Sequence, residues 1–227
     1  GGDKAAREPW RMGASLLSLI GRDDLIGRFW PRYAKLPMAA LIHNAHLTRT
    51  NSSAGRLFDG VAALLGLCET VQDEAYAAML LESTAERFSG PYPVLEGGWT
   101  VAEDGVLRVN GLIAAIVDRM QASREAAPDV LEAARNESAA LFHGTLSAAL
   151  ADWVARLVPA GTPVCMAGGT FLHRYLASDL PRRLENMGFS VHLPKQLPPG
   201  DGAVSFGQCA VAARRLASGS ESGTTSF

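Results

Sequence analysis

TPVCMAGGTFLHRYL, residues 162–176, is the stretch that decides the fold. An apolar segment that ends in two glycines and leads into a helical pattern is typical of a buried strand, a turn and a helix, here from Thr170 to Met187. A second extended segment, GFSVHLP at 188–194, precedes the loop QLPPGDG at 196–202 and a last helical stretch from Ala203 to Leu216. This alternation predicts an α/β fold in which a helix connects two parallel strands.

Gly168 and Gly169 lie where the first predicted strand ends. Ligands of α/β sheets bind at the carboxyl ends of strands, and glycines there let backbone N–H groups come close to a phosphate or a ribose. A glycine pair at a strand end also serves plain turn formation, and local evidence leaves that alternative open. The pair is therefore a candidate nucleotide-binding edge.

Asp201 lies in the loop that follows the second predicted strand. A carboxylate at this place binds a hard cation beside a phosphate, or it caps the next helix through the N-terminal amides, and local evidence favours the cap. Consecutive parallel strands end at the same edge of a sheet. We therefore expect Gly168, Gly169 and Asp201 to face one ligand.

A third candidate is SSAGR at 52–56, where Ser52 or Ser53 is expected to cap a helix. The free N–H groups at that helix start would suit a polar ligand, with Asp59 about one turn further on. The alternative is an ordinary serine cap followed by a solvated acid, which local evidence slightly favours.

Histidine offers three further candidates. His43 and His46, in HNAH, are three residues apart, but a helical metal pair requires a third ligand and none is adjacent. His143 lies inside a predicted long helix and suits packing or hydrogen bonding. His173 is expected one turn inside the helix after the glycine pair, within reach of a bound ribose or phosphate.

The remaining sequence predicts a helix-rich chain. A short helix is expected from Pro9 to about Gly21, and Asp104-Gly105 between apolar runs predicts a hairpin. From 1 to 217 we expect one compact unit, followed by a disordered polar tail at 218–227. Further helices are expected over Asp73–Phe88, Gly111–Gln121 and Pro128–Leu157, the last with one repeating apolar face.

Net charge and cysteine usage indicate which partners and which cellular compartment to expect. The 227 residues carry a formal net charge of −2, which gives no global reason to expect a nucleic acid or an anionic membrane as partner. The three cysteines, Cys68, Cys165 and Cys209, form no CxxC pair and are predicted to be reduced core thiols of a cytoplasmic protein. The chain lacks an initiating Met and a signal-peptide pattern, which suggests a domain cut from a longer polypeptide.

Several of these stretches, in this order, resemble the C-terminal part of the HypF-type hydrogenase-maturation carbamoyltransferases. The resemblance runs from the first residue to about Leu216. A more distant likeness to tRNA threonylcarbamoyl transferases of the TsaD type covers the same blocks, but the phrases GGDKAAREPWRM at 1–12 and GRLFD at 55–59 and the neutral charge disfavour it. The blocks are GGDKAAREPWRM at 1–12, SSAGRLFDGVAALLGL at 52–67, AAMLLE at 77–82, LFH at 141–143, AGGTFLHRYL at 167–176 and PPGDGAVSFGQ at 198–208.

The resemblance implies one lobe of an actin-like, ribonuclease H-like fold, helix-rich with a small sheet, whose cleft holds ATP, a divalent metal such as Mg or Fe and a carbamoyl-adenylate. In HypF-type enzymes the carbamoyl group of carbamoyl phosphate passes to the C-terminal cysteine of HypE. There it is dehydrated to a thiocyanate, the source of cyanide ligands for the nickel–iron site. The zinc-finger, acylphosphatase-like and YrdC-like domains of the family lie outside this sequence.

Carried over by position, the resemblance makes Asp201 the metal ligand and Gly168 and Gly169 the nucleotide-contacting glycines. It places Gly55 and Asp59, beside Ser53, at the ribose-side helix start, and it implies paired metal-binding histidines upstream of residue 1. The family usually has Asn in place of His173 and PPND in place of PPGD at 198–201. Two hypotheses follow: an enzyme lobe completed by a preceding lobe, or a docking module for HypE that has lost turnover.

Overall fold

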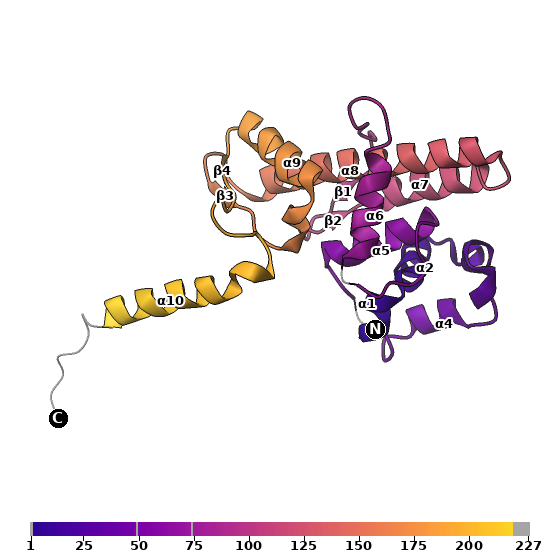
Figure 1. Ribbon diagram of the computed structural model, residues 1–227, viewed down its shortest axis with the longest axis horizontal. Helices are drawn as coiled ribbons and strands as arrows, with labels where there is room; N and C mark the ends of the chain where they lie inside the picture. Colours follow the sequence, from indigo (N-terminus) through magenta and orange to yellow (C-terminus); the bar gives the residue numbers. More distant parts are fainter. Residues whose placement is uncertain (1, 49, 74, 220–227) are drawn as a thin grey trace. The chain divides into compact units, whose positions relative to one another are not determined.

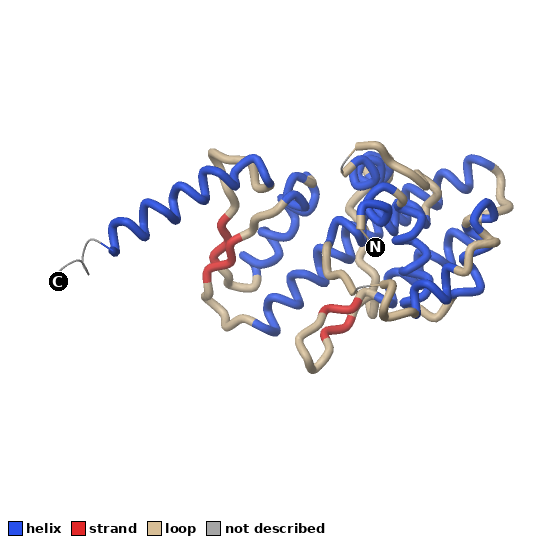
Figure 2. Tube along the Cα trace, turned by 90° about the horizontal axis from the view of Figure 1, so that it is seen from below, coloured by secondary structure: helices blue, strands red, loops and turns tan. Residues whose placement is uncertain are grey.

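The computed structural model describes residues 2–48, 50–73 and 75–219 (Figures 1 and 2). The chain forms two compact units, Gly1–Pro159 and Ala160–Phe227, where composition led us to expect one. Within the described residues no helix is both long and apolar enough to cross a membrane.

The first unit is almost entirely helical, as its sequence predicts. Its short hairpin turns at Gly105, which has a φ of +78°, so the hairpin predicted from Asp104-Gly105 is confirmed. The helices are α1 (Asp3–Arg7), α2 (Pro9–Leu19), η1 (Asp23–Leu25), α3 (Ile26–Phe29), η2 (Pro31–Tyr33), α4 (Met38–His43), α5 (Ala54–Leu64), α6 (Tyr76–Ala85), α7 (Asn110–Ala122) and α8 (Pro128–Leu157), and the hairpin strands are β1 (Thr100–Val101) and β2 (Leu107–Arg108).

Helices α2 and α5 cross at two glycines. A Cβ atom on Gly60 of α5 would lie 2.6 Å from Leu16 Cδ1 and 3.1 Å from the Met12 carbonyl carbon of α2. A Cβ atom on Gly13 of α2 would lie 2.5 Å from the Trp30 ring and 3.3 Å from the Gly60 carbonyl oxygen. The two helix backbones therefore approach so closely that neither glycine position has room for a side chain. The Trp30 ring and the Leu16 side chain pack directly on these two glycines.

Helix α8 runs over the bounds that the sequence predicts, Pro128 to Leu157, but its burial differs from the prediction. All twelve residues from 138 to 149 are buried, so the helix centre is enclosed on every side rather than along one apolar face. Phe142 meets Phe58 of α5 edge to face, with ring centroids 5.0 Å apart. Small residues such as Ala139 and Gly144 let neighbouring segments close over the rest of the helix.

The second unit contains the strand, helix and strand series that the opening stretch predicts. Strands β3 (Pro163–Cys165) and β4 (Ser190–His192) are parallel, with Val164 opposite Val191. Helix α9 (Arg174–Asn186) connects them, after the short 3-10 helix η3 (Gly169–Leu172) (Figure 1). The loop after β4 passes through η4 (Asp201–Ala203) into α10 (Val204–Gly219).

Three details of this unit correct the sequence-based prediction. Cys165 at the end of β3 is exposed and Val164 only half-buried, so β3 is not a buried strand, because a two-stranded sheet has few neighbours to cover it. The long helix begins at Arg174 rather than Thr170, since η3 occupies Gly169–Leu172, starting at the second glycine of the pair. Helix α10 continues to Gly219, and residues 220–227 of the expected tail lie outside the described residues.

We predict that Gly60→Ala lowers the free energy of unfolding by about 1–3 kcal/mol, because the added methyl overpacks the crossing with α2. Gly55→Ala is the matched control in the same helix, since its new Cβ would meet only Ser53 Oγ at 3.6 Å, an ordinary contact. That control should leave stability unchanged or raise it by up to about 1 kcal/mol through helix propensity. Urea denaturation followed by circular dichroism measures both, and equal stability of the two variants would contradict the prediction.

Candidate functional site

The two loops at the carboxyl ends of β3 and β4 touch each other. The Gly168 N–H donates a hydrogen bond to the Pro199 carbonyl oxygen, with an N···O distance of 2.6 Å. A Cβ atom on Gly200 would lie 3.3 Å from Gly169 Cα, so the two glycine backbones are in direct contact. The prediction that parallel strands bring both loops to one edge is confirmed. Gly200, which the sequence marked only as a departure from the PPND pattern, is the residue that permits the contact.

The backbone of Gly168 and Gly169 is accessible on the side where a side chain would lie. A Cβ atom on Gly168 or Gly169 would have no atom within 4 Å, and Gly168 has a φ of +110°, which L side chains rarely adopt. The Gly168 N–H is already used by Pro199, so it is not the free donor that the sequence suggested. The Gly169 N–H begins η3 and therefore has no partner within that helix, which leaves it as the amide that a polar ligand would meet.

Asp201 is exposed at the start of η4 and lies one residue after the contact between the loops. Gly200, not Asp201, holds the N-cap position of η4, and no side-chain cap is formed there. An exposed carboxylate suits a hard cation as an oxygen ligand. Among the described residues, however, no group of three or more His, Cys, Asp or Glu side chains is placed to hold a metal ion. The metal role of Asp201 stays a prediction, and a cation bound there would need further ligands besides this carboxylate.

His173 corrects a prediction, because it is the N-cap of α9 rather than a residue one turn inside it. Its side chain is 7% exposed, and Nδ1 accepts a hydrogen bond from the Leu176 N–H at 3.5 Å. The structure gives His173 a capping role, and a contact from it to a nucleotide stays a prediction.

Ser53, Gly55 and Asp59 belong to the other unit, on and before α5. Ser53 holds the N-cap position as predicted, but its hydroxyl makes no capping hydrogen bond. Its own N–H instead donates to Asn51 Oδ1 at 2.6 Å, which folds the preceding loop onto the helix start. The amides at the start of α5 therefore lack the serine cap, and Ser53 itself is exposed.

Asp59 is buried, so the alternative of a solvated acid is wrong. Only 4% of its surface is exposed, and Oδ2 lies 2.9 Å from Arg56 Nη1 one turn earlier in α5. Burial raises the pKa of Asp59, and the Arg56 guanidinium partly opposes this rise. Sequence reasoning overlooked Arg56, although the i, i+3 spacing to an acid is a recognisable signal of an ion pair.

The remaining histidines belong to no group of three or more possible metal ligands in the part of the chain that the structure describes. His43 ends α4, and its Nε2 lies 3.1 Å from Ser18 Oγ and 3.2 Å from Asp23 Oδ2. Because both partners meet the same ring nitrogen, this cluster is no relay of the serine-hydrolase kind, in which the acid meets the other nitrogen. His143 is fully buried with Nδ1 2.8 Å from the Ala139 carbonyl oxygen, which agrees with its predicted packing role.

The cysteines are free, but none is in the core, which corrects the expectation of core thiols. Cys165 and Cys209 are exposed, and Cys68 is half-buried. Burial, with a contribution from the charge of Asp59, raises the pKa of Cys68 to about 11. The raised pKa predicts low reactivity for the Cys68 thiol, and the charge of Asp59 contributes to it.

Comparison with known proteins identifies the family. A profile described as "Carbamoyltransferase, Kae1-like Domain, second subdomain" matches residues 1–208. The chain belongs to this carbamoyltransferase family. It is 42% identical over 232 aligned residues to a carbamoyltransferase HypF2 of Cupriavidus necator, covering 95% of this chain and 28% of the relative. It is 39% identical to a carbamoyltransferase HypF of Rhizobium leguminosarum bv. viciae, covering 93% and 26%.

Solved structures agree on the fold. A full-length HypF, crystallised in a phosphate- and nucleotide-bound form, superposes with a TM-score of 0.76 at 24% identity, covering 95% of this chain and 28% of that one. The HypF of T. kodakarensis superposes with a TM-score of 0.65 at 23% identity, covering 90% and 27%. The predicted α/β, helix-rich lobe of the HypF type is confirmed. The chain spans about a quarter of the length of these relatives.

We predict that Gly200→Ala separates the two loops, because its Cβ would press on Gly169 Cα. The amide of Gly168 should then exchange with solvent about tenfold faster or more, since it loses a hydrogen bond worth about 1 kcal/mol. Gly169→Ala is the control, because its Cβ points into open space. Hydrogen exchange followed by NMR measures both, and an unchanged Gly168 rate in Gly200→Ala would overturn the assignment of the contact.

Cys68 should react far more slowly with maleimide than the exposed Cys165 and Cys209, which serve as controls within the chain. At a pKa of about 11 rather than the ordinary 9.0, its thiolate population at pH 8 falls roughly one hundredfold. Asp59→Asn should speed the reaction of Cys68 several-fold, because it removes a negative charge that raises the pKa of the thiol. Labelling followed by mass spectrometry tests this, and an unaltered rate would contradict the contribution of the Asp59 charge to the pKa of Cys68.

Proposed function

We propose that this chain is the second lobe of a carbamoyltransferase of the HypF type, which uses ATP to pass a carbamoyl group from carbamoyl phosphate to the C-terminal cysteine of a HypE-type protein. The observation that carries the proposal is the contact of the Gly168-Gly169 and Gly200-Asp201 loops at one sheet edge. Open glycine backbone and an exposed carboxylate, held side by side, are what a nucleotide phosphate and its cation require. Membership of the carbamoyltransferase family supports the same ligand class.

The residues of this chain would bind and orient rather than act as acid or base. Open glycines let the phosphate of a nucleotide, or of a carbamoyl-adenylate, approach the Gly169 amide. Asp201 would hold a divalent cation, which supplies positive charge to the phosphate oxygens when it is bound. The acceptor thiolate then attacks the carbamoyl carbon and AMP leaves with the bonding electron pair. The relatives named above are about four times longer, which supports a cleft that a preceding lobe completes.

The second hypothesis, a docking module for a HypE-type protein without turnover, predicts a different binding result. Titration calorimetry of ATP and magnesium should show weak or no binding to this chain alone and clear binding once the first subdomain precedes it. Absence of binding in the extended protein as well would overturn the enzyme proposal in favour of docking. If the extended protein binds no ATP but still binds HypE, the docking module is established.

In the extended enzyme we predict that Asp201→Ala lowers carbamoyl transfer at least a hundredfold, since the cation loses an oxygen ligand. Glu185→Ala, which removes an exposed carboxylate from α9, is the matched control and should keep full activity. Excess Mg²⁺ should partly restore the Asp201→Ala rate. Transfer is measured by the mass of the modified HypE peptide, and full activity of Asp201→Ala would refute the metal role.

A Gly169→Val variant should fold but bind ATP at least tenfold more weakly. The new side chain would enter space that is open in the structure, so its effect falls on the ligand rather than on packing. Thermal denaturation checks the fold and calorimetry checks the affinity in the extended protein. Unaltered ATP affinity would remove the glycine pair from the site.

A further inference from the structure

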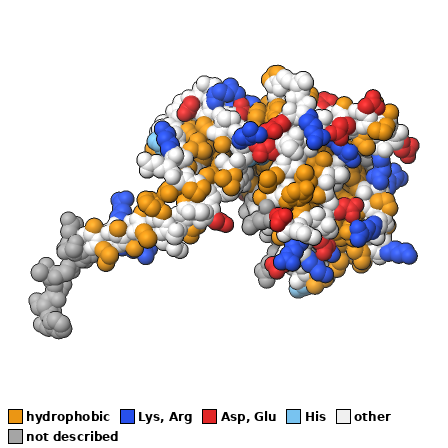
Figure 3. Space-filling view, in the orientation of Figure 1, with side chains coloured by type: hydrophobic (Ala, Val, Ile, Leu, Met, Phe, Trp, Pro, Cys, Tyr) orange, Lys and Arg blue, Asp and Glu red, His pale blue; other side chains and the backbone are white. Residues whose placement is uncertain are grey.

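Charge is unevenly distributed along the first unit. The segment 25–58 carries five Lys or Arg residues and no Asp or Glu, whereas the whole chain has a formal net charge of −2. In Figure 3, Lys and Arg side chains (blue) lie among apolar side chains (orange) on the surface of the first unit. Like charges gathered without acids repel one another, and a partner of opposite charge relieves that repulsion.

Three of these cations lie on one short, folded stretch of chain around α3 and η2. Arg28, Arg32 and Lys35 are all exposed. A Cβ atom on Gly27 would lie 3.4 Å from Ala34 Cβ, so the stretch folds back on itself and keeps the three cations close together. We call Arg28, Arg32 and Lys35 the basic face.

Aromatic rings hold this stretch in place. Trp30 is buried, and Tyr33 stacks on Trp10 of α2 with ring centroids 4.1 Å apart. The Arg32 guanidinium carbon lies 5.3 Å from the centre of the Tyr33 ring, within the range of a cation–π contact. The basic face is therefore anchored to the helices of its unit, which lowers the entropy that a bound partner would cost.

The first unit supplies the basic face with almost no counter-charge. Among the described residues neither Arg28 nor Lys35 has a carboxylate within 4.0 Å, and Arg32 reaches Glu69 only at that limit. Other arginines of the unit lie between 2.5 and 3.0 Å from a carboxylate oxygen, namely Arg11, Arg22, Arg87, Arg119 and Arg156. The cations of the basic face are thus set apart by their lack of close acidic partners.

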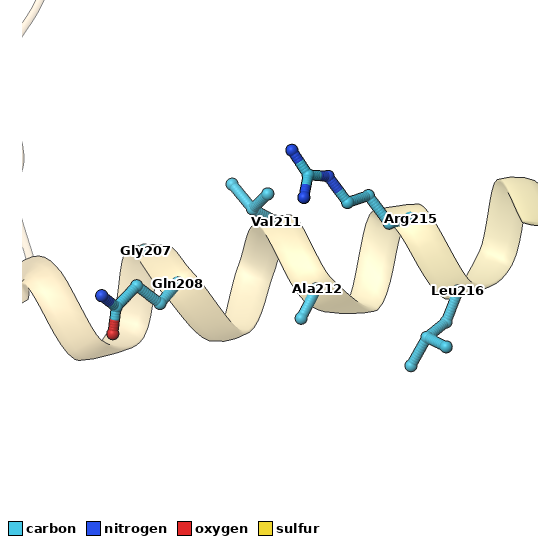
Figure 4. Close-up of a pocket in the computed structure, with 6 residues that line it drawn as sticks. All are labelled: Gly207, Gln208, Val211, Ala212, Arg215 and Leu216. Atoms are coloured by element: carbon cyan, nitrogen blue, oxygen red, sulfur yellow. The ribbon is translucent and has the colours of Figure 1, made fainter.

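The second unit does not complement the basic face. Residues 160–227 carry six Lys or Arg and four Asp or Glu, which makes that unit net positive. The shallow hollow that Figure 4 shows on α10 also contains no acid, since it is lined by Gly207, Gln208, Val211, Ala212, Arg215 and Leu216. A complement of opposite charge therefore lies outside the second unit.

We propose that the basic face is an interaction surface for an acidic segment of a partner protein. Pro31, Ala34 and Leu36 lie between or beside the cations and are exposed, so the surface suits a polypeptide with apolar side chains better than bare phosphates. Tyr33 already stacks on Trp10, which leaves it unsuited to stack a nucleic-acid base. The residues of the basic face take no part in the proposed carbamoyl transfer.

A fluorescein-labelled peptide of repeated Glu-Glu-Leu units has the chemistry of this occupant and serves as the probe. Fluorescence anisotropy should show that the chain binds it, with an affinity that falls about tenfold or more between about 0.05 and 0.5 M NaCl, because exposed charge pairs are screened by salt. A peptide of repeated Lys-Lys-Leu units and poly-uridine RNA are the control probes. Both should bind about tenfold more weakly than the acidic peptide.

Replacing Arg28→Gln, Arg32→Gln and Lys35→Gln together should weaken binding of the acidic peptide about tenfold or more, since three attractive charges are lost. A charge-preserving variant, with Arg28→Lys, Arg32→Lys and Lys35→Arg, should bind like the unaltered chain. Circular dichroism checks that both variants fold, and exposed positions make that the expected result.

The matched control removes the same number of positive charges elsewhere, through Arg87→Gln, Arg108→Gln and Lys195→Gln. All three side chains are exposed, and the affinity for the acidic peptide should change less than about twofold. An equal loss in this control would overturn the proposal, because only the net charge would then matter.

Four other results would also overturn it. These are no binding of the acidic peptide, or binding that the loss of the three cations leaves unchanged. Tighter binding of poly-uridine would assign the face to nucleic acid. Binding that is lost in the protein extended by the preceding subdomain, or that competes with self-association of this chain, would assign the face to that subdomain or to a second copy.

Discussion

Close approach between backbone segments, at positions that exclude a side chain, sets the packing of both units. In the first unit Gly60 brings α5 against α2, and in the second Gly200 brings the loop after β4 against the loop after β3. In both cases an added Cβ would press on backbone, namely the Met12 carbonyl carbon 3.1 Å from Gly60 and Gly169 Cα 3.3 Å from Gly200. At Gly60 it would also displace Leu16 Cδ1, which lies 2.6 Å away. The two contacts differ in their place in the fold. The contact at Gly60 lies in the core of the first unit, whereas the contact at Gly200 holds two loops together at an exposed edge of the sheet.

That second contact explains how a small two-stranded sheet can present a defined site. Strands of three residues supply little burial, and Cys165 at the end of β3 is exposed. The hydrogen bond from Gly168 to Pro199 joins the ends of the two strands beyond the ladder itself. It fixes Asp201 near the glycine pair with backbone groups alone, so the side chains there stay free for a ligand.

The candidate residues of the two units differ in their electrostatics. Asp201 is exposed and keeps its carboxylate available, whereas Asp59 is buried beside Arg56 and has a raised pKa. Burial costs the charged form of Asp59 hydration that a single cation only partly replaces. Asp201 is therefore suited to hold a cation, and Asp59 to keep a fixed geometry at the start of α5.

The sequence by itself determined the order and type of the elements, because glycine turns, helix periodicity and the Asp-Gly hairpin are local signals. Local signals also predict that the loops of Gly168, Gly169 and Asp201 lie at one edge of the sheet, since consecutive parallel strands end at the same edge. Only the tertiary structure decided that Asp59 is buried, that His173 caps α9, and that Gly200 touches Gly169. The burial of Asp59 and the contact of Gly200 with Gly169 depend on which distant segment lies opposite, and such contacts leave no periodic trace in the sequence. The cap at His173 is a local contact, and it depends on where η3 ends and α9 begins.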